Sequence, residues 1–221
     1  MDIKSFKQLP IMGILRGVDK DSIIPLAECI VSSGLKTVEI TMNAHGAPEL
    51  IRVMVKAANN RFTVGAGTVL SMDDLHRALD SGATFIVSPV LIDDVLRYCV
   101  KNNICVFPGA LTPQEIYKAV LLGATMVKVF PARFFGPEYF KELKGPFNNV
   151  ELLACGGVNL KNIGLFFSYG AAGVAFGGSI FKKEWLSAGD FFRIQESIKA
   201  LIESWQKSLS DKGKSRSKIF S

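Results

Sequence analysis

The chain has 221 residues, of which 48% are hydrophobic and 21% are charged, and its formal net charge is +6. This length accommodates one large domain with a substantial core, and the composition excludes an intrinsically disordered chain. No apolar run reaches the roughly 18 residues that a membrane-spanning helix needs. Residues 1–10 also lack the apolar core of a signal peptide. We therefore expect a cytoplasmic protein without a membrane partner.

Part of the positive charge lies in a serine-rich segment over residues 207–218. We predict that residues 209–221 form a flexible, solvated tail, although such a segment could also contact nucleic acid or a membrane. Elsewhere no basic stretch alternates with aromatic residues, so we expect no nucleic-acid partner.

Cysteine and histidine give no sign of a metal site. The two histidines, His45 and His76, do not have the spacing of metal ligands. The cysteines have no C-x-x-C spacing and lie in apolar segments, at positions 29, 99, 105 and 155. This pattern is typical of buried, reduced thiols in a cytosolic protein.

After a short helix predicted over residues 3–8, apolar segments alternate with amphipathic ones almost to the end of the chain. The apolar segments are predicted strands, in chain order 11–17, 37–42, 62–67, 85–89, 105–109, 126–131, 151–157 and 173–178. Each is followed by a predicted helix, in the same order about 22–33, 48–58, 72–82, 93–101, 113–122, 137–143, 160–169 and 190–208.

Capping residues mark several helix boundaries. Ser71 and Thr112 are placed as N-caps, Pro113 occupies a first helical position, and Gly34 is placed as a C-cap. Eight strand–helix units without a break in composition favour a (β/α)8 TIM barrel over residues 11–208, preceded by the helix within residues 1–10. A doubly wound open sheet is the alternative, but the first strand–helix turn lacks the G-x-G-x-x-G pattern typical of that fold.

The strand over residues 126–131 contains a lysine in an apolar context. Side chains alternate along a strand, so Met126, Lys128 and Phe130 share one face. A lysine is almost never fully buried unless it is paired or used in chemistry. Burial eases loss of its proton, which makes Lys128 a candidate amine nucleophile for a carbonyl substrate.

Few polar residues lie at the carboxyl ends of the predicted strands, where barrel enzymes carry their catalytic groups. They are Arg16, Glu39, Thr68, Ser88 and Lys128. We expect Arg16, Glu39 and Lys128 to meet inside the barrel, either as a stabilising ion cluster or as catalytic machinery. In the second case Lys128 forms a Schiff base with a keto group, and Glu39 transfers protons during carbon–carbon cleavage.

Two glycine pairs follow the seventh and eighth predicted strands. Gly156-Gly157 and Gly177-Gly178-Ser179 lie where barrel enzymes often bind a substrate phosphate through backbone N–H groups. We expect glycine there because a side chain would block the approach of the anion.

Together these residues identify a family. The chain resembles the bacterial 2-keto-3-deoxy-6-phosphogluconate/4-hydroxy-2-oxoglutarate aldolases from about Ile11 to Ser179. The resemblance rests on the two glycine pairs and on three motifs, Val38-Glu39-Ile40-Thr41, Val64-Gly65-Ala66-Gly67-Thr68-Val69-Leu70 and Val127-Lys128-Val129-Phe130-Pro131-Ala132.

The resemblance implies a class I aldolase, a lyase that works as a homotrimer without metal or cofactor. It would cleave a 2-keto-3-deoxy-6-phospho sugar acid to pyruvate and glyceraldehyde 3-phosphate, and 4-hydroxy-2-oxoglutarate to pyruvate and glyoxylate. Lys128 would be the Schiff-base lysine and Glu39 the general acid/base. Thr68 and Pro89 would line the pyruvate pocket, and Phe130 would pack beside the Schiff base. The phosphate would be held by Gly156, Gly157, Gly177, Gly178 and Ser179.

The sequence departs from the gluconate-type pattern at two positions. That branch usually has an arginine where this chain has Asn43, and here Arg16 is the candidate for binding the pyruvate carboxylate, as in the galactonate-type branch. Cys155 stands where the gluconate branch tends to have threonine and the galactonate branch valine, so the preferred configuration at C4 stays open. A role for Cys155 in packing is expected.

Two other functions are compatible with these residues. A phosphate-binding isomerase or epimerase would use Glu39 as a base without a Schiff base, and a non-catalytic barrel would bind a sugar phosphate without turning it over.

Overall fold

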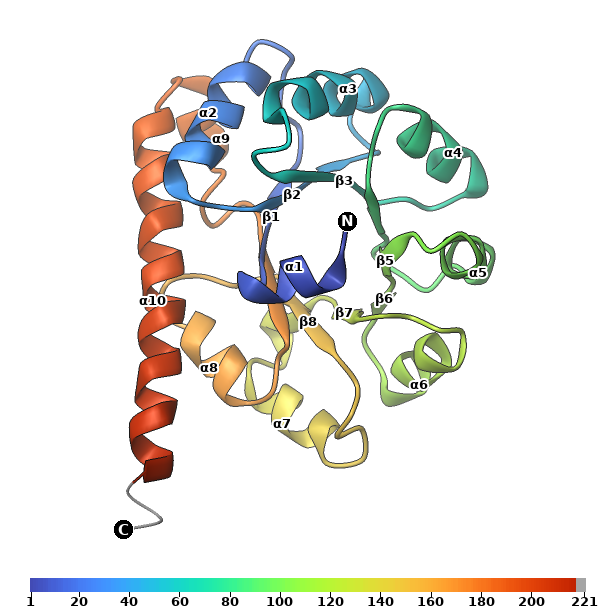
Figure 1. Cartoon of the computed structure of the whole chain (residues 1–221), viewed down its shortest axis with the longest axis vertical. Coiled ribbons are helices and arrows are strands. Elements are labelled where there is room, and N and C mark those ends of the chain that lie inside the picture. Colours follow the sequence, from blue (N-terminus) through green and yellow to red (C-terminus); the bar gives the residue numbers. More distant parts are fainter. Residues whose placement is uncertain (218–221) are drawn as a thin grey trace.

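The computed structural model describes the backbone of residues 1–217 and the side chains of residues 1–210. In this part of the chain, parallel strands form a barrel surrounded by helices (Figure 1). The strands follow one another in the order β5-β4-β3-β2-β1-β9-β8-β7-β6. The fold is the predicted single-domain (β/α)8 TIM barrel.

The elements have the following bounds. The strands are β1 Ile11–Leu15, β2 Thr37–Thr41, β3 Thr63–Gly67, β4 Phe85–Val87, β5 Cys105–Phe107, β6 Gly109–Ala110, β7 Val127–Val129, β8 Leu152–Cys155 and β9 Gly173–Phe176. The helices are α1 Ile3–Gln8, α2 Ile23–Ser33, α3 Ala47–Ala58, α4 Met72–Asp80, α5 Asp93–Lys101, α6 Pro113–Leu121, the 3-10 turn Ala132–Phe134, α7 Glu138–Lys144, α8 Ile163–Ser168, α9 Lys183–Ser187 and α10 Phe191–Ser217.

The fifth predicted strand is present as two pieces, β5 and β6, which are separated only by Pro108. β5 pairs with β4, and β6 pairs with β7. The Lys128 backbone N–H donates to the Pro108 carbonyl at 2.9 Å, so the hydrogen-bond ladder passes through the proline. The two pieces therefore act as one barrel strand, and β8 and β9 are the seventh and eighth.

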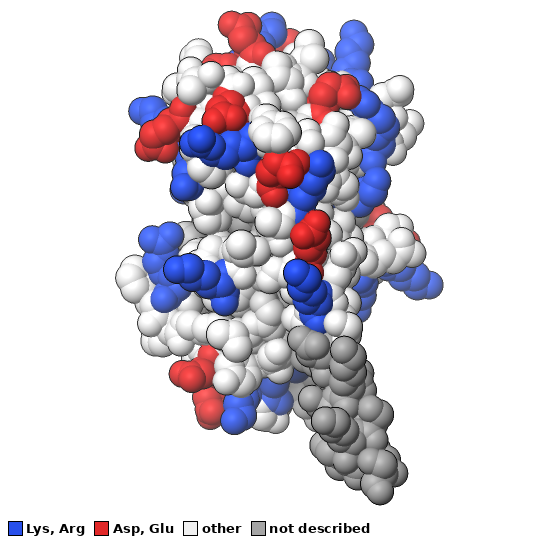
Figure 2. Space-filling view, turned by 90° about the vertical axis from the view of Figure 1, so that its left-hand side faces the viewer, with Lys and Arg blue, Asp and Glu red and all other residues white. Residues whose placement is uncertain are grey.

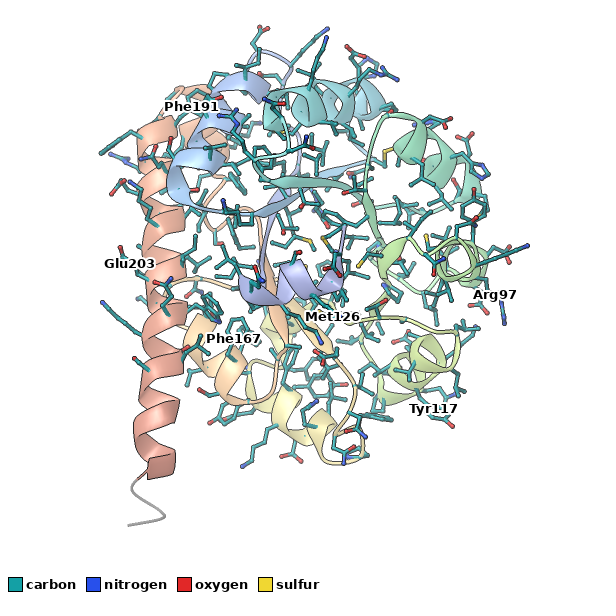
Figure 3. All side chains as sticks on the ribbon, in the orientation of Figure 1. Arg97, Tyr117, Met126, Phe167, Phe191 and Glu203 are labelled. Atoms are coloured by element: carbon teal, nitrogen blue, oxygen red, sulfur yellow. The ribbon has the colours of Figure 1, made fainter. Side chains whose placement is uncertain are left out.

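The amino-terminal end of the barrel is filled by aromatic side chains. Phe6 of α1 packs against Phe107 with 5.6 Å between ring centroids, and Phe107 packs against Phe85 at 5.9 Å. Figure 1 shows α1 lying across this end, and Figure 3 shows Met126 beneath it in the middle of the barrel. Gly65 has no side chain because a Cβ there would meet the Phe85 ring at about 2.5 Å. This end is closed, so access to the interior lies at the carboxyl ends of the strands.

Several predicted boundaries need correction. The first strand stops at Leu15 and the seventh at Cys155, because Gly17, Gly156 and Gly157 have positive φ values of 64°, 98° and 82°, which a strand cannot contain. The 3-10 turn Ala132–Phe134 and α9 were not predicted, since elements this short show no apolar periodicity.

The last helix is longer than predicted, since α10 continues through Ser217 and does not end at Ser208. Its described apolar face packs on the barrel through Ile194, Ile198, Leu201 and Trp205, which are all buried. The side chains of residues 211–217 and all of residues 218–221 lie outside the described part, and the flexibility of the tail stays a prediction. None of the described helices is long and apolar enough to cross a membrane.

The face formed by α10 and its neighbours carries both signs of charge. Figure 2 shows acidic and basic side chains interspersed over it. Two ion pairs lie along α10, between Arg193 and Asp190 and between Lys199 and Glu196.

Candidate active site

A pocket of about 660 Å³ opens at the carboxyl ends of the strands. Apart from Glu39, every predicted site residue lines it: Arg16, Thr68, Pro89, Lys128, Phe130, Gly156, Gly157, Gly177, Gly178 and Ser179. These residues come from loops and strands far apart in the sequence. The barrel therefore brings the predicted set together in one place.

Lys128 lies on β7 between Val127 and Val129, which face the helices. Its side chain is only 5% exposed, and the ammonium nitrogen Nζ lies 5.5 Å from the centroid of the Phe130 ring. No salt bridge neutralises this lysine within the described residues. It lines the pocket, so a ligand bound there lies next to this side chain.

Glu39 lies on β2 behind the pocket wall and is 1% exposed. Burial raises the pKa of its carboxyl group, against the opposing influence of the positive charges of Lys128 and Arg16. Its Oε2 atom has no hydrogen-bond partner among the described residues. These features favour the protonated acid, which can donate a proton to a group bound at Lys128.

The absence of a side chain at Gly67 leaves room for the Glu39 carboxyl group. A Cβ on Gly67 would lie 2.6 Å from the Glu39 carboxyl carbon, which is closer than van der Waals contact allows. The glycines of the motif over residues 64–70 therefore serve the barrel interior: Gly65 admits Phe85, and Gly67 admits the Glu39 carboxyl group.

Cys155 lies on β8, is 2% exposed, and lines the same pocket as Lys128. Burial raises the pKa of the thiol, although the positive charges of Lys128 and Arg16 act in the opposite direction. A neutral thiol thus shares the pocket with the candidate nucleophile. The sequence predicted packing for Cys155, and the structure adds that it lines this pocket.

Thr68 follows β3 with a backbone φ of 54°. This left-handed conformation is unfavourable for a β-branched residue, and such strain clusters at functional sites. Two backbone hydrogen bonds hold the segment, from Met42 N–H to the Gly67 carbonyl at 2.7 Å and from Val69 N–H to the Val87 carbonyl at 3.2 Å.

We expect Thr68→Gly to stabilise the fold, because glycine adopts this conformation without strain. The relief of about 1–2 kcal/mol exceeds the entropy that glycine adds to the unfolded chain, so Tm should rise by about 2–4 °C. Thr63→Gly is the matched control: Thr63 lies in β3, where glycine weakens a strand and should lower Tm. Calorimetry of both variants measures this, and a lower Tm for both would contradict strain at Thr68.

The two glycine loops present unused backbone donors. The N–H groups of Gly157, Val158, Gly178 and Ser179 donate to no acceptor in the described part of the chain. Two asparagines brace the first loop, since the Nδ2 atoms of Asn159 and Asn162 donate to the Gly157 carbonyl at 3.0 and 2.9 Å. Free N–H groups held in this way are suited to binding an anion.

We expected glycine in these loops because a side chain would block the approach of an anion. This reason fits some of the positions and not others. A Cβ on Gly178 would have no atom within 4 Å, so only a ligand would meet it. A Cβ on Gly157 would instead lie 2.7 Å from the Arg133 Cβ, and Gly157 has a positive φ. Gly157 is therefore required by its conformation and by its neighbour Arg133, while Gly178 leaves room in the pocket.

Sequence reasoning missed three polar residues of the pocket wall, Arg133, Asn159 and Lys183. Asn159 follows the first glycine pair directly and could have been found from that position. Arg133 and Lys183 gave no comparable signal, because a basic residue in a loop is usually solvated.

Comparison with known proteins agrees with this arrangement. The family profile described as KDPG and KHG aldolase matches residues 3–197. The chain is 31% identical to the 2-dehydro-3-deoxy-6-phosphogalactonate aldolase of Escherichia coli K12, over 79% of this chain and 86% of the relative. It is also 31% identical to the 2-dehydro-3-deoxy-phosphogluconate aldolase of Haemophilus influenzae, over 91% of this chain and 95% of the relative.

A solved structure shows the same fold. The KDPG aldolase of Legionella pneumophila, with pyruvate captured as a covalent carbinolamine intermediate, is 25% identical with a TM-score of 0.79, and the match covers 87% of this chain and 93% of that one. With its profile matched over residues 3–197, its barrel and its buried lysine, the chain belongs to the KDPG and KHG aldolase family.

Proposed function

We propose that the protein is a class I aldolase that cleaves a 2-keto-3-deoxy-6-phospho sugar acid to pyruvate and glyceraldehyde 3-phosphate, and 4-hydroxy-2-oxoglutarate to pyruvate and glyoxylate. The observation that carries the proposal is the buried Lys128 that lines the pocket, with the buried Glu39 near enough to feel its charge. The covalent pyruvate intermediate of the Legionella pneumophila relative supports it.

The chemistry follows from these two side chains. The neutral Lys128 amine attacks the keto carbon, and the resulting carbinolamine loses water to give a Schiff base. The protonated Schiff base accepts the electron pair of the C3–C4 bond as the C4 hydroxyl loses its proton, which releases the aldehyde and leaves an enamine. Protonation of the enamine and addition of water release pyruvate and restore Lys128. Glu39, whose pKa is raised by burial, moves the protons in these steps.

Binding groups lie at both ends of the pocket. Arg16 projects from the end of β1 and lies close enough to Glu39 to influence its pKa, so its planar guanidinium is placed to bind the substrate carboxylate beside Lys128. Thr68, Pro89 and Phe130 surround the keto carbon. The four free N–H groups of the glycine loops, with the Ser179 hydroxyl, bind the phosphate.

We expect Gly178→Ala to weaken substrate binding without loss of stability. The new methyl group meets no protein atom within 4 Å but projects among the free N–H groups, and displacing a phosphate by about 1 Å can lower kcat/KM by about 10²-fold. Steady-state kinetics and thermal unfolding check both parts. Gly157→Ala is the contrasting variant, which should lose stability as well, and an unchanged KM for Gly178→Ala would place the phosphate elsewhere.

The direct test of the proposed function is trapping with pyruvate and sodium borohydride, followed by intact mass and peptide mapping. A reduced adduct on Lys128, together with pyruvate release from 2-keto-3-deoxy-6-phosphogluconate or its galactonate isomer, is expected. If the folded protein gives no adduct, the Schiff-base mechanism is wrong. Isomerisation of a sugar phosphate would then indicate an isomerase or epimerase. Binding of a sugar phosphate without turnover would indicate a non-catalytic binding protein.

We also propose that the protein is a cytoplasmic homotrimer. Exposed apolar side chains lie in the loops at the carboxyl ends of β3, β4 and β7, including Val90 at 49%, Phe134 at 76% and Phe135 at 53% exposure. An oligomer would bury such a surface. Sedimentation should give the mass of three chains, and Phe134→Asp should shift it toward one. All four cysteines are free and buried, which fits a reducing compartment.

A further inference from the structure

The pocket carries more positive charge than the proposed chemistry uses. Four of its lining residues are cationic, namely Arg16, Lys128, Arg133 and Lys183. None of them forms a salt bridge within the described residues. Lys128 is the nucleophile and Arg16 faces the carboxylate, so Arg133 and Lys183 are left without a role.

Arg133 is held against the first glycine loop. It lies in the 3-10 turn after β7, which is fixed by the buried Ala132 and by a 2.9 Å hydrogen bond from Gly136 N–H to the Ala132 carbonyl. A Cβ on Gly157 would meet the Arg133 Cβ at 2.7 Å and its Nε at 3.7 Å. The arginine side chain therefore runs alongside the loop that carries the free N–H groups of Gly157 and Val158.

Lys183 follows the other glycine loop. It is the first residue of α9, a few residues after Gly178 and Ser179, and it lines the same pocket. Both cations therefore line the pocket that also contains two pairs of free backbone donors, one from the loop after β8 and one from the loop after β9. An anion bound to these N–H groups would have both a guanidinium and an ammonium group within the same pocket.

We propose that Arg133 and Lys183 bind the phosphate at the far end of the substrate and make this chain select phosphorylated sugar acids over unphosphorylated ones. The inference rests on the proposed aldolase function and specifies which side chains of this chain recognise the phosphate. Backbone N–H groups alone accept a range of anions, whereas an arginine fork matches the geometry of a phosphate dianion. A substrate that lacks the phosphate would leave both cations without a counter-charge.

The test compares Arg133→Met with the wild type on 2-keto-3-deoxy-6-phosphogluconate and on its unphosphorylated counterpart, or on the galactonate pair if that isomer is cleaved. The ratio of the two kcat/KM values is expected to fall about 10- to 100-fold, as for loss of a hydrogen bond to a charged group. Arg133→Lys should restore part of the ratio, because it keeps the charge without the fork. Lys183→Met should lower the ratio in the same direction.

Arg97→Met is the matched control. Arg97 is an exposed arginine on α5 at the outer rim of the barrel (Figure 3), and its removal should leave the ratio unchanged. The yield of the borohydride-reduced pyruvate adduct is measured for every variant, since pyruvate has no phosphate and reports on Lys128 alone.

The outcomes separate the two proposals. An unchanged ratio in Arg133→Met, with normal adduct yield, would overturn the inference and leave the aldolase function standing. A parallel loss of both activities and of the adduct would show that Arg133 only supports the fold, and would also overturn the inference. Absence of adduct in the wild type would instead overturn the aldolase function itself.

Discussion

Lys128→Met is expected to abolish aldol cleavage and the pyruvate adduct while the barrel stays folded. Methionine has a similar length and no charge, so it fits a site that is 5% exposed without leaving a buried ammonium group unpaired. Loss of a covalent nucleophile typically lowers kcat by about 10⁴- to 10⁶-fold. Continuous detection of released pyruvate, with intact mass after borohydride reduction, measures both effects.

Lys118→Met provides the control for this experiment. Lys118 lies on α6 and forms an exposed ion pair with Asp93 at 2.8 Å, so its loss removes the same charge without touching the pocket. Thermal unfolding should show that both variants are folded. An adduct that persists in Lys128→Met would assign the Schiff base to another amine, and Lys183 is then the next lysine of the pocket to examine.

Glu39→Gln is expected to have two opposite effects, a lower turnover and a more stable fold at neutral pH. Removing a general acid/base typically costs about 10²- to 10⁴-fold in rate. The stability effect follows from the raised pKa of the buried carboxyl group. Glutamine has the shape of the protonated acid. Unlike glutamate, it does not ionise when the chain unfolds at neutral pH.

The sign of the pH dependence is fixed by that raised pKa. Below about pH 4.3, the ordinary glutamate pKa, both folded and unfolded wild type carry the protonated acid, and the two proteins should differ least. As the pH rises, the unfolded chain ionises while folded Glu39 does not, so the wild type loses stability until the pH passes the folded pKa. Urea unfolding between pH 4.5 and 7.5 should show a widening gap in favour of Glu39→Gln. A gap that is constant with pH would mean that folded Glu39 has an ordinary pKa.

The barrel could be predicted from the sequence because eight apolar strands alternate with capped helices, as Ser71 and Thr112 illustrate. Both residues form the expected cap hydrogen bonds, to the N–H groups of Asp74 and Glu115. The burial of Lys128 and Glu39 inside the barrel was also predictable. A charged residue in an apolar strand is costly unless it is paired or used in chemistry. These signals are local, and therefore a single sequence contains them.

What the sequence could not supply depends on contacts between distant segments. Nothing in the chain indicates that Gly67 makes room for Glu39, or that Gly157 makes room for Arg133. Cys155 and Lys128 come from two strands that the sequence only places in order, and the barrel brings both into one pocket. Arg133 has the composition of an ordinary solvated loop residue, and only its position against the glycine loop makes it part of the pocket.

The aromatic side chains of Phe6 and Phe107 close the amino-terminal end of the barrel, so both products leave through the pocket at the carboxyl ends of the strands. At the moment of carbon–carbon cleavage the pyruvate part is still bound covalently to Lys128 as the enamine, whereas the aldehyde is free. Glyceraldehyde 3-phosphate must therefore depart first and pyruvate last. Kinetically this is an ordered uni-bi reaction, in which pyruvate inhibits competitively against the sugar acid and the aldehyde inhibits noncompetitively.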